Sequence, residues 1–265
     1  MPIASPDRAG AKQSVSLVNM KKDAYQPRTY RHWIEDKDLL SFTVTVKETD
    51  LFIRATSNLQ RKALRLVEKY RGQLERYIEK NPDFQTSLKP IPASSKAPRI
   101  AIEMIEAGQK TGVGPMAAVA GAIAEHVGRE LLEFSPEIIV ENGGDIFLKI
   151  SRKRTVGIYA GDSPLTGKVG LEISPQDTPL GICTSSGTVG HSLSFGKADA
   201  VVILAETATL ADAVATAIGN RVKHHDDVES AIAFGKDIRG LKGIVIIIGK
   251  NVGAWGDVKL CETSV

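Results

Sequence analysis

Residues 181–220 constrain the fold of this chain more than any other stretch. An apolar strand end is followed by a run of small residues over 184–190, and such a run cannot build a hydrophobic core. It lets backbone N–H groups and hydroxyls approach a ligand closely, because glycine accepts unusual φ values and has no side chain. A buried strand over 199–204 and a helix over 209–219 are expected next. The stretch therefore predicts a strand, a ligand-binding loop, a strand and a helix in succession.

The expected helix over 209–219 carries two polar side chains on one face. Asp212 and Thr216 are four residues apart, so their side chains lie one turn apart on the same side. A carboxylate and a hydroxyl are suitable oxygen ligands for Mg²⁺ or Ca²⁺. The alternative is local: with Thr209 as N-cap, Asp212 lies at the third helical position, where it favours the helix dipole by roughly 0.5–1 kcal/mol. The spacing alone leaves both interpretations open.

Composition excludes several classes of protein. A net charge of +3 over 265 residues is too small to indicate a nucleic-acid partner. The sequence contains no run of 18 apolar residues, so no segment is expected to span a membrane. The first thirty residues contain no apolar core of the kind that a signal peptide has. Two cysteines, Cys183 and Cys261, do not make a disulfide framework, and Cys183 beside Ile182 is expected to be a small buried residue rather than a nucleophile. We expect a cytoplasmic protein with no nucleic-acid or membrane partner, and a homodimer is left open.

The order of elements predicts the fold class. Residues 1–27 are polar, with scattered proline and glycine, and are expected to be a flexible N-terminal tail. Residues 28–265 are expected to form a single domain of two lobes, with a boundary in the Pro/Ser-rich segment 89–98. Strands and helices are interspersed without strict βαβ alternation, which favours an α+β fold, with mixed α/β layers, over a doubly wound parallel sheet. The GxGxxG and Walker A signatures are absent.

Two further glycine-rich segments precede residue 181. In the first, Gly112 and Gly114 lead into Pro115 and a run of alanine, which is typical of a thin helix. Its N-terminus is expected either to receive an anion or to pack tightly. In the second, the letters Asn-Gly-Gly-Asp at 142–145 lie between two apolar runs. Asn-Gly in that position predicts a β-hairpin turn, which is the simple structural interpretation of this segment.

These segments, in this order, resemble the ApbE superfamily, whose characterised members are metal-dependent FAD:protein FMN transferases, once called thiamine biosynthesis lipoproteins. The matching motifs are VGPMAAVAGAIAE, VENGGDI, CTSSGTVGHSLSFGKADA and LADAVATAIGN. An uncharacterised cytoplasmic branch of that superfamily carries them much as they stand here, over nearly the whole chain beyond the tail. The match to the transferases themselves is firm over residues 112–220. The resemblance implies an ApbE-like two-lobed fold.

The resemblance also implies roles for particular residues. It places a divalent cation, Mg²⁺ or Ca²⁺, on the side chains of Asp212 and Thr216 and on the backbone carbonyl of Ala117. It places a flavin nucleotide, FAD or FMN, along two segments. The residues of these segments are Asn142, Gly143, Gly144, Asp145, Thr184, Ser185, Ser186 and Gly187. Two departures stand beside these matches. The transferases carry Lys where this chain has Ala118, and of their motif His-x-x-Asp-Pro-x-Thr-Gly only His191 has a counterpart here.

Three functions follow as alternatives. The first is an enzyme that transfers FMN from FAD to an acceptor hydroxyl on a partner protein, with a cation at the pyrophosphate and His191 as catalytic general base. The second is a non-catalytic flavin or dinucleotide binding module. The third is an enzyme that acts on another phosphate-containing small molecule in the same cleft. For His191 the alternative role is structural, as a hydrogen-bond donor that holds the glycine-rich loop in place.

Overall fold

A central antiparallel sheet organises the computed structural model, which describes residues 31, 33, 34, 38–188 and 195–263. Its neighbouring strands all pair antiparallel. In spatial order the strands are β1 (Leu40–Val46), β2 (Thr49–Ala55), β3 (Ile138–Asn142), β4 (Asp145–Lys149), β7 (Leu180–Ser185), β8 (Ala200–Ala205), β9 (Leu241–Ile248) and β10 (Asn251–Gly256). A smaller sheet joins β11 (Leu260–Glu262), β6 (Val169–Ile173) and β5 (Arg154–Gly157) in that order. The expected tail over 1–27 lies outside the described residues.

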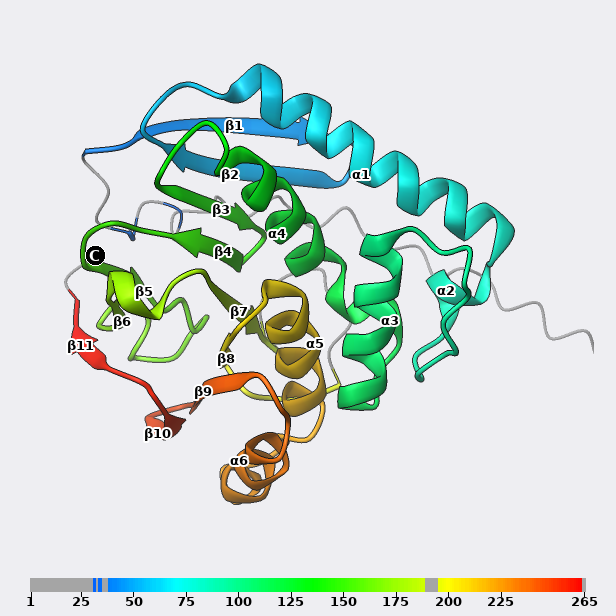
Figure 1. Ribbon diagram of the computed structural model, residues 1–265. Helices are drawn as coiled ribbons and strands as arrows, with labels where there is room; N and C mark the ends of the chain where they lie inside the picture. The colour runs from blue at the N-terminus through cyan, green and yellow to red at the C-terminus, as the bar shows by residue number, and fades with distance from the viewer. Residues whose placement is uncertain (1–30, 32, 35–37, 189–194, 264–265) are drawn as a thin grey trace, which may run out of the picture.

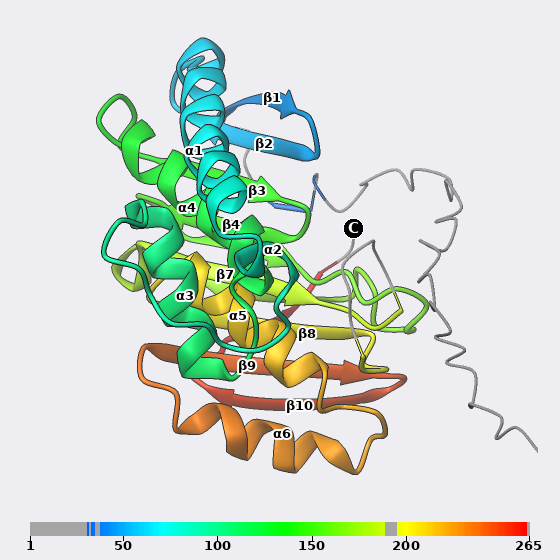
Figure 2. The ribbon, with the colours of Figure 1, turned by 90° about the vertical axis from the view of Figure 1, so that its right-hand side faces the viewer.

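The two faces of the large sheet are covered differently. Helices lie against one face, and the small sheet lies near the other (Figures 1 and 2). The helices are α1 (Gln60–Lys80), α2 (Asp83–Thr86), α3 (Arg99–Thr111), α4 (Val119–Leu131), α5 (Ala208–Gly219) and α6 (Asp227–Lys236), with short 3₁₀ turns η2 (Pro115–Ala118) and η3 (Pro175–Asp177). This arrangement confirms the α+β prediction. The lobe boundary expected within 89–98, between α2 and α3, stays a prediction. Among the described residues, no helix is both long enough and apolar enough to cross a membrane.

Coverage on both faces explains the apolar runs in the central strands. In β8 the side chains of Val201 and Ile203 pack with the helices, whereas Val202 and Leu204 pack with the small sheet. Successive strand residues point to opposite faces, so a strand that is buried on both faces needs apolar residues at every position. The sequence of β8 is accordingly continuous in Val, Ile and Leu rather than alternating.

The Asn-Gly-Gly-Asp segment forms the predicted hairpin turn. Asn142 pairs with Asp145 across the β3–β4 ladder, which leaves Gly143 and Gly144 as the two turn residues. Their φ angles are 69° and 105°. Positive φ at both central positions is the requirement of the type I′ turn, whose twist fits a hairpin, and glycine meets it without steric strain.

The predicted start of α5 is wrong by two residues. The N-cap is Thr207, whose hydroxyl accepts from the Leu210 amide at 3.1 Å. Thr209 instead lies in the first turn and points inward, where its hydroxyl contacts the Glu125 carboxylate at 3.1 Å. Asp212 is therefore in the second turn rather than at the third helical position. The helix-dipole explanation of Asp212 weakens, because that effect falls off within the first turn.

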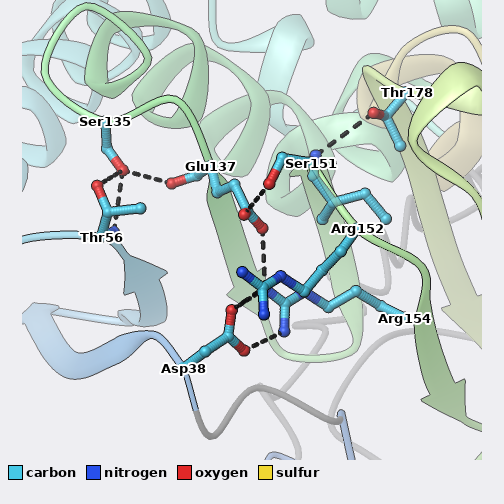
Figure 3. Close-up of polar contacts among 9 residues, drawn as sticks. Asp38, Thr56, Ser135, Glu137, Ser151, Arg152, Arg154 and Thr178 are labelled. Carbon is cyan, nitrogen blue, oxygen red and sulfur yellow. Dashed lines mark hydrogen bonds and ion pairs between the residues drawn. The ribbon is translucent and has the colours of Figure 1, made fainter.

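A buried arginine ties the small sheet to the large one. Arg154 begins β5, and its guanidinium lies 2.6 Å from Asp38 Oδ1 and 2.8 Å from Glu137 Oε2 (Figure 3). Glu137 directly precedes β3, and its carboxylate also bonds the Ser151 hydroxyl. Arginine presents several donors in a fixed fork, so one side chain can hold two carboxylates at once. The cluster fixes the end of β3 that is distant from the Asn-Gly-Gly-Asp turn.

Candidate functional site

Three segments that are far apart in the sequence meet beside the start of α4. The Gly121 amide donates to Asp212 Oδ2 at 2.9 Å. The Ala120 carbonyl accepts from Asn142 Nδ2 at 3.0 Å. Because Asn142 opens the hairpin turn and Asp212 lies in α5, the start of α4 is bonded to both. At the level of whole elements, α4 contacts α5 and β4, and α5 contacts β7 (Figure 1).

Asp145 closes the turn and reaches the neighbouring strand β7. Its side chain is buried, and its carboxylate accepts from the Thr184 amide and interacts with the Cys183 thiol. The Sγ atom of Cys183 also lies 3.3 Å from the Ala208 carbonyl oxygen at the start of α5. One carboxylate oxygen, Asp145 Oδ1, is buried without a hydrogen-bond partner. The turn, the end of β7 and the start of α5 therefore share one buried cluster.

Asp212 supplies α4 with an N-terminal cap from another helix. The N-cap position of α4 is Ala118, which has no side-chain acceptor, whereas Asp212 accepts from the amides of Ala120 and Gly121. The two helices approach closely because residue 121 is glycine. A Cβ at that position would lie 2.3 Å from the Ala208 carbonyl oxygen and 2.9 Å from Asp212 Cβ. Asp212 is still only half-buried, so a ligand can reach it from solvent.

The site brings acidic side chains together where burial disfavours their ionisation. Burial raises the pKa of Asp145 well above its ordinary value, and the nearby charge of Asp212 raises it further. Burial also raises the pKa of Asp212 to about 7, although the backbone N–H groups of Gly121 and Ala120 oppose this shift. Burial, with the same two carboxylates, raises the pKa of the Cys183 thiol. A fully buried thiol with a raised pKa is a poor nucleophile, which agrees with the predicted buried role of Cys183.

A buried ion pair holds the hairpin turn from below. Glu141 Oε1 accepts from the Gly144 amide at 2.9 Å, and Glu141 Oε2 accepts from Arg31 Nε at 2.7 Å. The Arg31 guanidinium also donates to the Asp50 carbonyl at 2.8 Å. Both glycines of the turn lack side chains, so these bonds fix its backbone. Sequence reasoning missed this support, because Arg31 and Glu141 are 110 residues apart.

A second buried carboxylate fixes the start of α5. Glu125 Oε2 accepts from the Thr209 amide and from the Thr209 hydroxyl, both at 3.1 Å, and Glu125 Oε1 accepts from Arg129 Nε at 2.8 Å. An acidic group at the N-terminus of a helix satisfies free amides and favours the helix dipole. Glu125 thus sets the position of the helix that carries Asp212. Glu125 is the last residue of the motif VGPMAAVAGAIAE, but sequence reasoning assigned it no role of its own.

The other expected site residues lie at different distances along the chain from Asp145 and Asp212. Thr216 is half-buried on α5, one turn after Asp212, and Ala117 is in η2, which contacts α5. Ser185 and Ser186 continue from Thr184 toward the surface, and the Gly187 amide closes the loop on the Ala198 carbonyl at 2.9 Å. His191 lies outside the described residues. A surface hollow of about 310 Å³ at the start of α1, lined by residues 58–62, is separate from these residues.

Gly114, directly before η2, serves packing rather than anion binding. A Cβ on Gly114 would lie 1.8 Å from the Ser87 carbonyl oxygen. Gly112 ends α3 with φ at 78°, as a helix-terminating glycine commonly does. A carbonyl oxygen against Gly114 presents negative partial charge where an anion would have to sit. Of the two interpretations of this segment, tight packing is the one that the structure supports.

The side chains of the cluster fit a divalent cation. Mg²⁺ and Ca²⁺ take oxygen ligands from carboxylates, carbonyls and hydroxyls. The cluster offers the carboxylates of Asp145 and Asp212, with an unpartnered oxygen on Asp145. Within the described residues, no group of three or more His, Cys, Asp or Glu side chains could hold a metal ion. A cation here would therefore depend on carbonyl, hydroxyl, water or substrate oxygens beside the carboxylates.

The raised pKa of Asp212 predicts how stability depends on pH. In the folded chain this carboxyl holds its proton up to about pH 7, whereas its ordinary value is 3.8. Between those values the unfolded state binds fewer protons, so the free energy of unfolding should fall as pH rises from about 4 to 7. Thermal unfolding at several pH values, with a chelating agent present to keep the protein metal-free, measures this fall in stability. Asp212→Asn should reduce the fall, and an identical pH profile in both proteins would contradict the prediction.

Comparison with solved structures places the fold among the ApbE proteins. The chain matches an apo form of the flavinyl transferase ApbE of Pseudomonas stutzeri with a TM-score of 0.52 and 13% identity, over 82% of this chain and 93% of that one. It matches the ApbE protein of Thermotoga maritima with a TM-score of 0.52 and 13% identity, over 81% and 96%. At this level of identity the match defines the fold.

Sequence comparison gives the family. A family model described as "AbpE bacteria" matches residues 31–259, and the chain belongs to that family. The UPF0280 protein of Methanopyrus kandleri is 44% identical over 225 residues, which are 82% of this chain and 91% of that protein. The UPF0280 protein of Methanocaldococcus jannaschii is 41% identical over 221 residues, with 81% and 90% covered. The predicted membership of an ApbE-like branch is confirmed.

Proposed function

We propose that this chain is a cation-dependent flavin transferase, which moves the FMN half of FAD to an acceptor hydroxyl. One observation carries the proposal: the Asn-Gly-Gly-Asp turn, the end of β7 and the Asp212 face of α5 converge on one site. The flavinyl transferase activity named for the Pseudomonas stutzeri structure of the same fold supports this class of reaction. The ligands are therefore a flavin dinucleotide, a divalent cation and an acceptor, which we propose to be a protein.

Each segment of the site has a part in binding. Asp212, Thr216 and the Ala117 carbonyl would hold the cation, and residues 142–145 and 184–187 would line the nucleotide. When bound, the cation would neutralise charge on the pyrophosphate. The turn suits close approach of a ligand, because nothing lies within 4 Å of a Cβ built on Gly143. The Glu141 carboxylate behind the turn keeps that surface in place before a ligand arrives.

The transfer step balances as a phosphoryl-group substitution. The acceptor oxygen forms a bond to the phosphorus of the FMN half, and the bond from that phosphorus to the bridging oxygen breaks. AMP leaves with the bridging oxygen, and the hydroxyl proton passes to a base. Positioning and charge stabilisation supply most of the catalysis in such reactions, so the fixed geometry around Asp212 matters more than any single acid or base.

A binding module without turnover is the second candidate. One specific observation favours it: where the transferases carry Lys, this chain has Ala118, and Ala118 is fully buried. A cationic side chain that could approach a phosphate is thus replaced by a small apolar side chain in the core. Binding of FAD would remain in that case, because the turn, the β7 loop and Asp212 do not depend on residue 118.

The two candidates are separated by incubating the protein with FAD and Mg²⁺. Binding is read from the visible absorption and fluorescence of the flavin, and turnover from AMP release and from the mass of Ser- or Thr-containing acceptor peptides. We expect FAD binding that requires Mg²⁺, and AMP release when an acceptor is present. Binding without AMP release would support the binding module. Absence of binding at any cation concentration would contradict both.

His191→Ala tests the general base. If His191 accepts the acceptor proton, the variant should lose about 10²–10⁴-fold in the rate of AMP release, which is the usual contribution of such a base. The affinity for FAD should be unchanged. The matched control is His225→Ala, because His225 is exposed at a different loop. A rate within about twofold of wild type would leave His191 only the structural role of holding its loop.

A further inference from the structure

We propose that Asp145 is a further ligand of the divalent cation, beside Asp212, so that the cation would join the hairpin turn to α5. The inference rests on the proposed function for the presence of a cation. It assigns to Asp145 a role that the family motif gives only to Asp212, Thr216 and Ala117. The chemical class of the ligand is a hard divalent ion such as Mg²⁺ or Ca²⁺.

One oxygen of the Asp145 carboxylate lacks a hydrogen-bond partner. The side chain is 8% exposed, and the Thr184 amide and the Cys183 thiol account for its hydrogen bonds. Its Oδ1 atom has no partner, and within the described residues it is the only buried carboxylate oxygen of this kind. An ionised carboxylate that is buried without full pairing is strongly unfavourable. Oδ1 therefore needs a proton or a cation.

The charged groups around Asp145 make a positive partner for its carboxylate more necessary. The groups whose charge acts most on it are Asp212 and Glu141, and both are acidic. Glu141 is already satisfied by Arg31 and the Gly144 amide. Asp212 is held by the Ala120 and Gly121 amides, which fix its position without neutralising its charge. The cluster thus contains two carboxylates, Asp145 and Asp212, and no cationic side chain bonded to either in the described chain.

A proton on Asp145 is the alternative way to relieve this repulsion. A protonated Oδ1 would be a hydroxyl donor in need of an acceptor, and Oδ1 has no hydrogen-bond partner. In the described residues Asp145 and Asp212 act on each other through charge, and no hydrogen bond joins them. A cation needs no hydrogen bond between the two groups, because one oxygen of each carboxylate can coordinate it. Two carboxylates also match the double positive charge of Mg²⁺ or Ca²⁺.

Calorimetric titration with Mg²⁺, with and without FAD, tests the inference on the folded full chain. Asp145→Asn keeps an acceptor for the Thr184 amide and removes the charge. We expect it to bind Mg²⁺ at least about 100-fold more weakly than wild type, since even outer partners of metal ligands contribute about 10–100-fold. The control is Asp199→Asn, because Asp199 is half-buried between two alanines, as Asp212 is, and its carboxylate bonds the Gly249 amide at 2.7 Å. The control should bind as wild type does.

The outcomes separate this inference from the proposed function. If wild type binds Mg²⁺ and Asp145→Asn binds within about threefold of it, Asp145 is not a ligand and only this inference is overturned. If wild type binds no cation, with or without FAD, the proposed function is overturned, and the inference that rests on it is overturned with it. Asp145→Cys gives an independent measurement, because a thiolate ligand favours soft metals. The ratio of Cd²⁺ to Mg²⁺ affinity should rise at least about tenfold, and an unchanged ratio would overturn the inference.

Discussion

Asp212→Asn should weaken Mg²⁺ binding at least about 100-fold and leave the melting temperature of the metal-free protein unchanged or higher. The asparagine side chain keeps a carbonyl oxygen that can accept from the Gly121 amide, so the cap on α4 survives. The substitution also removes a half-buried carboxyl group whose pKa is raised by burial. Charge and an oxygen ligand are lost together, and Mg²⁺ depends on both. Calorimetry gives the affinity, and thermal melting in a chelating agent gives the stability.

Two companion variants sharpen this test. Thr216→Val removes only a hydroxyl from the same face of α5, so we expect a smaller loss of Mg²⁺ affinity, about tenfold. Asp199→Asn is the control for a general loss of surface charge, and its affinity should stay at the wild-type value. If Asp212→Asn bound Mg²⁺ normally, the Asp212 carboxylate would be only a cap for α4. If it melted far below wild type, the cap would need the charge itself.

Gly121→Ala should lower the free energy of unfolding, although it adds only one methyl group to α4 and leaves the charge unchanged. The new Cβ would lie 2.3 Å from the Ala208 carbonyl oxygen, which belongs to backbone and cannot rotate away. Overpacking of this kind costs typically 1–3 kcal/mol and occasionally more. Because α4 and α5 would separate, the bond from Gly121 to Asp212 would also weaken. We expect a loss of about 3 kcal/mol, or a fall in melting temperature of about 6–12 °C.

Gly72→Ala is the matched control for this substitution. Gly72 also lies inside a helix, α1, but a Cβ there would meet only the end of the Arg76 side chain, at 3.1 Å from Nη1. That side chain can move, so the better helix propensity of alanine should raise stability by up to about 1 kcal/mol. Opposite signs for the two variants are the expected result. Equal effects would show that helix propensity, rather than the contact with α5, decides the outcome at residue 121.

The parts of the fold that depend on neighbours in the sequence were predictable. The hairpin at 142–145 follows from Asn-Gly between apolar runs, and the strand expected over 199–204, observed as Ala200–Ala205, follows from its continuous apolar run. The burial of Cys183 followed from its apolar neighbour. Each of these features is set by local sterics or by the periodicity of one element, and a single sequence contains that information.

The parts that depend on distant partners were not predictable. Thr207 and Thr209 are both acceptable N-caps, and only the Glu125 carboxylate, 84 residues away, draws Thr209 inward. In the same way, the spacing of Asp212 and Thr216 indicated oxygen ligands, but it could not indicate that Asp145 lies beside Asp212. A period of 3.6 residues shows which side chains share a face. It does not show which other segment that face meets.

The long separations between bonded residues also determine when the site can form. Its contacts join residues that are 84, 91 and 110 positions apart, through Glu125, Asp212 and Arg31 respectively. Closing such long loops is entropically costly and slow compared with forming local turns. During synthesis, the hairpin at 142–145 can form well before α5 leaves the ribosome, but the carboxylates of Asp145 and Asp212 meet only afterwards. A nascent chain that ends before residue 212 should therefore bind neither cation nor nucleotide, however well its earlier strands have paired.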